Sequence, residues 1–104
     1  MILATSDRIE GREIVETLGL VRGNSARTRG IGYDITAGIR NIFGGAVPEY
    51  ANLITTARDE ATANMVAAAQ AQGADAIVAV RYTTSMISSG VSEILAFGTG
   101  VKLR

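Results

Sequence analysis

Candidate chemical groups gather on one predicted helix, directly after a pair of glycines. Glu49 and Tyr50 lie in its first turn, and Arg58 and Glu60 follow one to three turns later. At the N-terminus of a helix, such a polar cluster can bind an anion or a substrate carboxylate. We favour a structural interpretation, in which Glu49 complements the helix dipole and Arg58 pairs with a carboxylate across a subunit contact.

A second candidate group lies where a predicted strand leaves its apolar stretch, at Arg81 and Tyr82. Two interpretations remain open for the Arg81 guanidinium. It can anchor a ligand, or it can pair with Glu93 on the partner strand of a hairpin, because opposed charges on neighbouring strands stabilise a sheet modestly. We favour the structural pair.

A basic, glycine-containing segment spans residues 25–32 and predicts a flexible connection. The arginines in and around it are Arg22, Arg27, Arg29 and Arg40. They can gather phosphate or acidic ligands if a ring brings several copies together, although such a run is more often solvated. Its glycines lack both the Lys-Ser/Thr ending of a phosphate loop and the G-x-G-x-x-G spacing of a dinucleotide site.

The chain contains no Cys and no His. Disulfides, thiolate nucleophiles, imidazole-based triads and the usual zinc ligands are therefore excluded. No Asp-x-Asp-x-Asp loop for a hard cation is present, and surface solvation accounts for the carboxylates Asp34, Glu49, Asp59 and Glu60. We expect no metal site, no cofactor and no catalytic centre within a single chain.

Charge and hydropathy predict the compartment of the protein and exclude two classes of partner. Ten basic residues balance ten acidic ones, so no net field attracts the chain to nucleic acid or to an anionic membrane. No apolar run approaches the length of about 18 residues that spans a membrane, and the first residues do not resemble a signal peptide. We expect a cytoplasmic protein with neither a nucleic-acid nor a membrane partner.

The length of 104 residues predicts one domain over residues 1–104. Residues 2–5 are compatible with a short edge strand. Residues 12–22 predict a β-branched and aliphatic strand, in which Gly19 marks a bulge or a close backbone contact. A helix is predicted over residues 35–42, because three isoleucines recur there at helical spacing.

A longer helix is predicted from Pro48 to about Gln72, and Gly73 ends it. Residues 76–84 and 92–103 predict two further strands, which a short loop over residues 86–90 joins as a hairpin. Small residues on the inward stripe of the helix allow it to lie close to a sheet. The stripe consists of Leu53, Ala57, Ala61, Met65 and Ala68.

The last predicted strand has two unlike faces. One face carries Leu95, Phe97 and Val101, and the other has almost no side-chain bulk, with Ala96, Gly98 and Gly100. The elements together predict a two-layer α+β domain, in which a long helix packs on one face of an antiparallel three-stranded sheet. One face and two edges remain unprotected, so we expect the bulk-free face to complete its packing against another subunit.

The chain contains, in this order, Asp34-Ile35, Ala37-Gly38-Ile39-Arg40, Gly44-Gly45 with Glu49-Tyr50, Ala57-Arg58 with Glu60-Ala61, Met65, Gly73-Ala74-Asp75-Ala76-Ile77-Val78, Val80-Arg81-Tyr82 and Phe97-Gly98-Thr99-Gly100-Val101. These motifs resemble the YbjQ-like family of small bacterial and archaeal proteins over almost the whole chain. The resemblance implies a dodecin-subunit-like fold, strand-helix-strand-strand with spatial order 1-3-2, and assembly into a ring, as a pentamer. The family label "putative heavy-metal-binding" also implies metal binding, but without Cys or His a soft metal lacks its usual ligands.

Two functions from different classes follow as hypotheses. We favour a non-enzymatic ring that binds a small molecule at its subunit interfaces or serves as a scaffold. The alternative is an enzyme whose site forms between subunits, with Glu49 or Glu60 as base, Tyr50 as proton donor and Arg58 or Arg81 as anion clamp. Storage of a flavin or another aromatic ligand rests on the fold analogy to dodecins alone.

Overall fold

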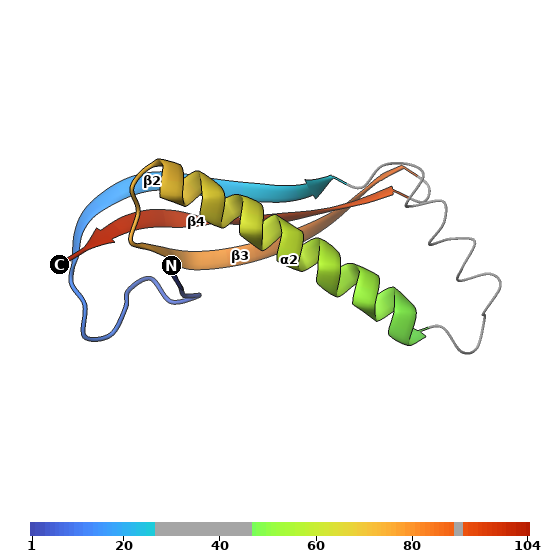
Figure 1. The fold of residues 1–104 in the computed structure, drawn as a ribbon, viewed down its shortest axis with the longest axis horizontal. Helices are drawn as coiled ribbons and strands as arrows, with labels where there is room; N and C mark the ends of the chain where they lie inside the picture. Colours follow the sequence, from blue (N-terminus) through green and yellow to red (C-terminus); the bar gives the residue numbers. More distant parts are fainter. Residues whose placement is uncertain (27–46, 89–90) are drawn as a thin grey trace.

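The structure is a computed structural model, and it describes residues 1–26, 47–88 and 91–104, with side chains described for residues 1–25, 54–85 and 93–104. The helix predicted over residues 35–42 and most of the basic segment 25–32 lie outside the described residues. The elements follow one another as β1 (Ile2–Leu3), β2 (Ile14–Ala26), α2 (Val47–Ala71), β3 (Ala76–Ser88) and β4 (Val91–Leu103) (Figure 1).

The four strands form one sheet in the order β1-β3-β4-β2. β4 lies between β2 and β3 and runs antiparallel to both, whereas β1 pairs parallel with β3. Ala4 fixes this parallel edge, since its N–H donates to the Ile77 carbonyl and its carbonyl accepts from the Val80 N–H, both at 3.0 Å. The α+β class is confirmed. Sheet order and polarity differ from the predicted three-stranded antiparallel sheet, because the N-terminal segment adds a parallel fourth strand.

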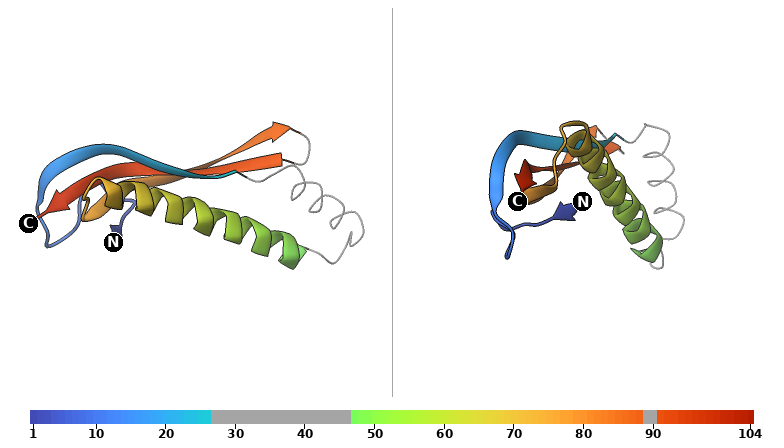
Figure 2. Two further views of the ribbon diagram at one scale, coloured as in Figure 1. Left: turned by 45° about the horizontal axis from the view of Figure 1, so that its top comes forward. Right: turned by 60° about the vertical axis from the view of Figure 1, so that its left-hand side comes forward.

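Each of the three long strands contains 13 residues, which exceeds the usual strand length of about 3 to 10 residues. β3 and β4 extend into the region predicted as the hairpin loop and leave only residues 89–90 between them. The subunit is correspondingly elongated (Figure 2). Its Cα radius of gyration is 16.6 Å, against about 13 Å for a compact domain of 100 residues.

Helix α2 ends in a Schellman motif, as the position of Gly73 predicts. Gly73 has a φ of 80°, a left-handed conformation that a residue without a Cβ adopts at little cost. Its N–H donates to the Gln70 carbonyl at 3.0 Å, and the Ala74 N–H donates to the Ala69 carbonyl at 3.0 Å. These two bonds satisfy carbonyl groups that the end of the helix would otherwise leave unpaired.

The C-terminal half of α2 packs on the sheet at backbone distance. A Cβ on Gly23 of β2 would lie 2.5 Å from the Ala61 carbonyl oxygen of the helix and would collide with the Met65 nitrogen. Ala57, Ala61 and Met65 are buried as predicted. The next buried position is Ala69 rather than Ala68. The buried positions of this part of the helix therefore recur at every fourth residue.

The small residues of β4 face this helix. Ala96 is fully buried in one cluster with Ala61 and Met65, and a Cβ on Gly100 would contact Val21 and Gln72. The expectation that this face packs against another subunit is therefore wrong. Its lack of bulk allows α2 of the same chain to approach closely.

A second apolar cluster lies on the opposite face of the sheet, at the end where the two termini meet. It consists of Ala76, Val78, Val101 and Leu103, against which Ile9 and Ile14 pack. The segment between β1 and β2 thus covers only this end of the helix-free face (Figure 1).

Candidate functional site

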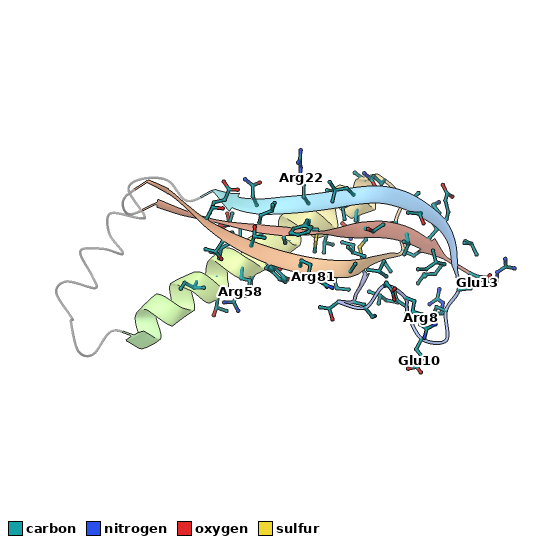
Figure 3. The ribbon with its side chains drawn as sticks, turned by 180° about the vertical axis from the view of Figure 1, so that it is seen from behind. Arg8, Glu10, Glu13, Arg22, Arg58 and Arg81 are labelled. Atoms are coloured by element: carbon teal, nitrogen blue, oxygen red, sulfur yellow. The ribbon has the colours of Figure 1, made fainter. Side chains whose placement is uncertain are left out.

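Beyond the second cluster, the helix-free face of the sheet is uncovered by any described residue, and we call this region the open half-face. Phe97 of β4 lies at its centre, with Arg22 of β2 opposite on one side and Arg81 of β3 opposite on the other. Leu95 is half-buried beside it, and Leu20 has 63% of its surface exposed. Apolar side chains and two arginines thus make up this surface, and Figure 3 shows the Arg22 side chain extending outward from the edge at β2.

Arg81 does not pair with Glu93. The register places Arg81 opposite Phe97, and Glu93 opposite Ser85, so the predicted charge pair is wrong. The Arg81 Nη1 instead donates to the Thr5 carbonyl at 2.9 Å and to the Val80 carbonyl at 2.8 Å. Part of this guanidinium therefore ties the N-terminal segment to β3.

A bulge in β3 determines which way Arg81 points. Val78 lies opposite Thr99 and Arg81 opposite Phe97, so β3 uses one residue more than β4 over this interval. Ala79 lies inside it with a φ of 55°, a strained value for a residue with a Cβ. The extra residue allows Val80 to join the core under α2 while Arg81 emerges on the other face. Sequence patterns did not predict this bulge, because alanine has no preference for positive φ.

Tyr82 faces the helix side and holds α2 where it crosses the edge of the sheet. The Thr62 hydroxyl donates to the Arg58 carbonyl at 2.8 Å and lies 2.8 Å from the Tyr82 hydroxyl. Because the single proton of Thr62 is already donated to Arg58, Tyr82 donates to Thr62. The predicted candidate Tyr82 therefore has a structural bond to the helix.

The structure does not bring the other predicted site residues together. Arg58 and Glu60 are both exposed on α2, where Arg58 lies close to the edge of the sheet and Arg22 extends from the far edge (Figure 3). Glu49 and Tyr50 belong to the first turn of α2, but their side chains lie outside the described ones. Phe97 was not predicted as the centre of a site, because only the strand register places it between two arginines.

The far end of the sheet carries an exposed ion pair. Arg104 Nε lies 3.0 Å from Glu13 Oε2, with 75% and 66% of the two side chains exposed, and Arg12 Nε donates to the Arg104 carbonyl at 3.1 Å. Exposed pairs of this kind contribute about 0 to 1 kcal/mol. This end thus carries a surface contact rather than a second site.

Comparison with known proteins gives one consistent family. A family model described as "Putative heavy-metal-binding" (YbjQ) matches residues 1–104. A UPF0145 protein of Halorubrum lacusprofundi is 52% identical over 104 residues, covering 100% of both chains. A UPF0145 protein of Photobacterium profundum is 53% identical over 103 residues, covering 99% of this chain and all of the relative. The chain belongs to this YbjQ/UPF0145 family.

A solved structure supports the fold. The crystal structure of a protein of unknown function from Pediococcus pentosaceus, assigned to the DUF74 family, matches with a TM-score of 0.65 and 18% identity, covering 100% of this chain and 98% of that one. At this identity the match supports the fold alone. In the part of the chain that the structure describes, no helix is both long and apolar enough to cross a membrane.

The metal-binding description of the family does not fit the donors of this chain. Soft metals prefer thiolate and imidazole ligands, and the sequence contains neither Cys nor His. Among the described side chains, no three Asp or Glu groups are close enough together to hold a metal ion. No metal-dependent step follows from these residues.

Proposed function

We propose that this protein is a non-enzymatic, ring-forming protein that binds a small molecule between its subunits or serves as a scaffold. The ring consists of copies of this chain, with five copies as the expected number. The observation that carries the proposal is the surface that a single subunit leaves exposed.

That surface is large for the size of the chain. The subunit exposes 6750 Å², against about 5,500 Å² for a compact monomer of 10.8 kDa. The exposed apolar side chains include Leu20, Val15 and Tyr82, with exposed fractions of 63%, 48% and 43%. Association with further copies would remove such side chains from water, which is favourable in proportion to the apolar area buried.

Binding or scaffolding also agrees better with the contacts of the candidate residues than an inter-subunit enzyme does. The Arg81 Nη1 is engaged by two backbone carbonyls, and the Tyr82 hydroxyl is engaged by Thr62. An anion clamp would need the guanidinium to turn towards a substrate. Phe97 and the two arginines beside it offer a surface for contact instead of an acid and a base.

Native mass spectrometry and light scattering of the protein purified from its host test the proposal. We expect a mass of about 54 kDa, which is five times the chain mass of 10.8 kDa, together with any ligand that the ring retains. A monomer that carries neither a ligand nor a partner would overturn the proposal.

A further inference from the structure

Two strand edges of the subunit are open on opposite sides of one sheet. β2 is the last strand of the sheet, and no described residue pairs with its outer edge. On the other side, β1 pairs with β3 at Ala76 and Ile77, and backbone bonds to the N-terminal segment continue as far as Val80. From Arg81 onward, no described backbone group pairs with the outer edge of β3.

The open stretches are the regular parts of their strands. β2 has register shifts at Ile14/Glu16 and Thr17/Gly19 and then pairs regularly over eight residues, 19–26, which include the stretch 20–26. β3 pairs regularly over six residues, 81–86, between its two register shifts. The stretches 20–26 and 81–86 therefore have nearly the same length and an uninterrupted register, which allows another strand to join them.

The two open edges also lie at the same level of the sheet. Leu95 of β4 faces Asn24 of β2 on one side and Thr83 of β3 on the other. In the same way, Glu93 faces Ala26 and Ser85. In a closed ring of strands, the strands tilt relative to the ring axis and each joint is staggered along the strands by a small fixed amount. Two edges at nearly matching levels can therefore close a ring.

The half of the sheet near the termini, by contrast, is protected against such pairing. There, two bulges interrupt β2 and β1 covers β3. Bulges, covering strands, Pro and charged side chains, Lys above all, are devices by which proteins protect their edges. The stretches 20–26 and 81–86 contain neither Lys nor Pro, and their only charged residues are Arg22 and Arg81, so most of this protection ends where both edges become regular.

We propose that the outer edge of residues 20–26 in one copy pairs with the outer edge of residues 81–86 in the next, so that the sheets join round the ring. This inference rests on the proposed ring and specifies its interface. β2 and β3 both run antiparallel to β4, so rotation preserves their common direction and the new pair is parallel. The N-terminal half of α2 projects past the edge of β3 and would lie over this joint (Figures 1 and 2).

A second copy is the partner that these observations favour. A foreign peptide that adds a strand needs only one open edge, whereas this chain carries two, matched in length, level and direction. Arg22 and Arg81 share one level, and like charges opposite one another are destabilising. The pairing is therefore offset by two residues, which places Asn24 beside Ser85 or beside Arg81 of the neighbour.

Disulfide cross-linking between copies tests this interface, and the chain has no native Cys to interfere. Neighbouring strands lie about 4.8 Å apart, within the range that a disulfide bridges. Two double variants are compared, Asn24→Cys with Ser85→Cys and Asn24→Cys with Arg81→Cys. The matched control combines Val15→Cys, on the bulged part of β2, with Ser85→Cys.

Under mild oxidation, we expect one double variant to form a ladder of covalent oligomers ending at the ring size, at least about tenfold faster than the control. Failure of both pairs to exceed the control, while the wild type has the mass of a ring, would overturn this interface and leave the proposed function standing. Self-linking of single variants would also overturn it, since it would place two identical edges together. A monomeric wild type would overturn both proposals.

Discussion

On the face that α2 covers, the sheet presents Gly23 and Ala96, whereas the helix-free face presents Arg22 and Phe97 at the neighbouring pair. The covered face has lost its side-chain bulk so that a helix can rest almost on the strand backbone. The open face retains bulk and charge because nothing in the described chain packs there. Small residues in this sheet thus mark an internal contact, and large exposed residues mark the surface available to a partner.

The largest effect is expected from removal of the bulge that separates the two faces, by deletion of Ala79. A one-residue deletion moves the side chains on one side of it to the opposite face of the sheet. If the residues after position 79 exchange faces, Arg81 turns towards α2. If the residues before it exchange faces, Ile77 turns out of the core. An uncompensated buried charge costs at least about 3 kcal/mol, and loss of a buried Ile costs a similar amount. Urea unfolding followed by circular dichroism measures the loss.

Ala79→Gly is the matched control for this deletion. It keeps the extra residue and relieves the positive φ of 55°, so its stability should equal that of the wild type or exceed it by up to about 1 kcal/mol. If the deletion variant unfolds at the same urea concentration as Ala79→Gly, the bulge does not separate the two faces.

A smaller but still large effect is expected from Gly23→Ala, which adds one methyl group under the helix. Its Cβ would lie 2.5 Å from the Ala61 carbonyl oxygen and 2.6 Å from the Asn64 carbonyl carbon, so α2 must move. Overpacking of this kind costs about 2 to 3 kcal/mol. The neighbouring substitution Asn24→Ala, on the open face, should change the free energy of unfolding by less than about 0.5 kcal/mol. Equal unfolding midpoints for the two variants would contradict the close approach of α2.

Local patterns predicted those parts of the fold that depend on local chemistry. Gly73 ends α2 because a left-handed residue is needed there, and Ala57, Ala61 and Met65 are buried because helical spacing places them on one stripe. The same residue patterns could not show which partner each face has. The bulk-free side of β4 suggested a second subunit, yet it packs against α2 of the same chain.

The parts that sequence patterns missed depend on register between distant strands. Arg81 and Glu93 are opposite charges on hairpin partners, but the bulge at Ala79 places Arg81 beside Phe97 instead. Likewise, the parallel pairing of β1 depends on backbone bonds from Ala4 to β3, which no side-chain pattern encodes. Arg81 was therefore predicted as a site residue from its residue type, whereas Phe97 was not predicted.

The smallest effect, and one of opposite sign, is expected at Ser25 on the covered face. Ser25 is fully buried beside Ile94 of β4, and its hydroxyl has no hydrogen-bond partner among the described residues. An unsatisfied buried hydroxyl is destabilising, so Ser25→Ala should raise the free energy of unfolding by up to about 1 kcal/mol. Ser25→Thr, which keeps the hydroxyl and adds a methyl group, should lower the free energy of unfolding.

Urea unfolding of both Ser25 variants, at dilute and at concentrated protein, sharpens the comparison of the two faces. A loss of stability for Ser25→Ala at both concentrations would contradict the unpaired hydroxyl, and a loss confined to concentrated protein would mean that another copy reaches this covered face.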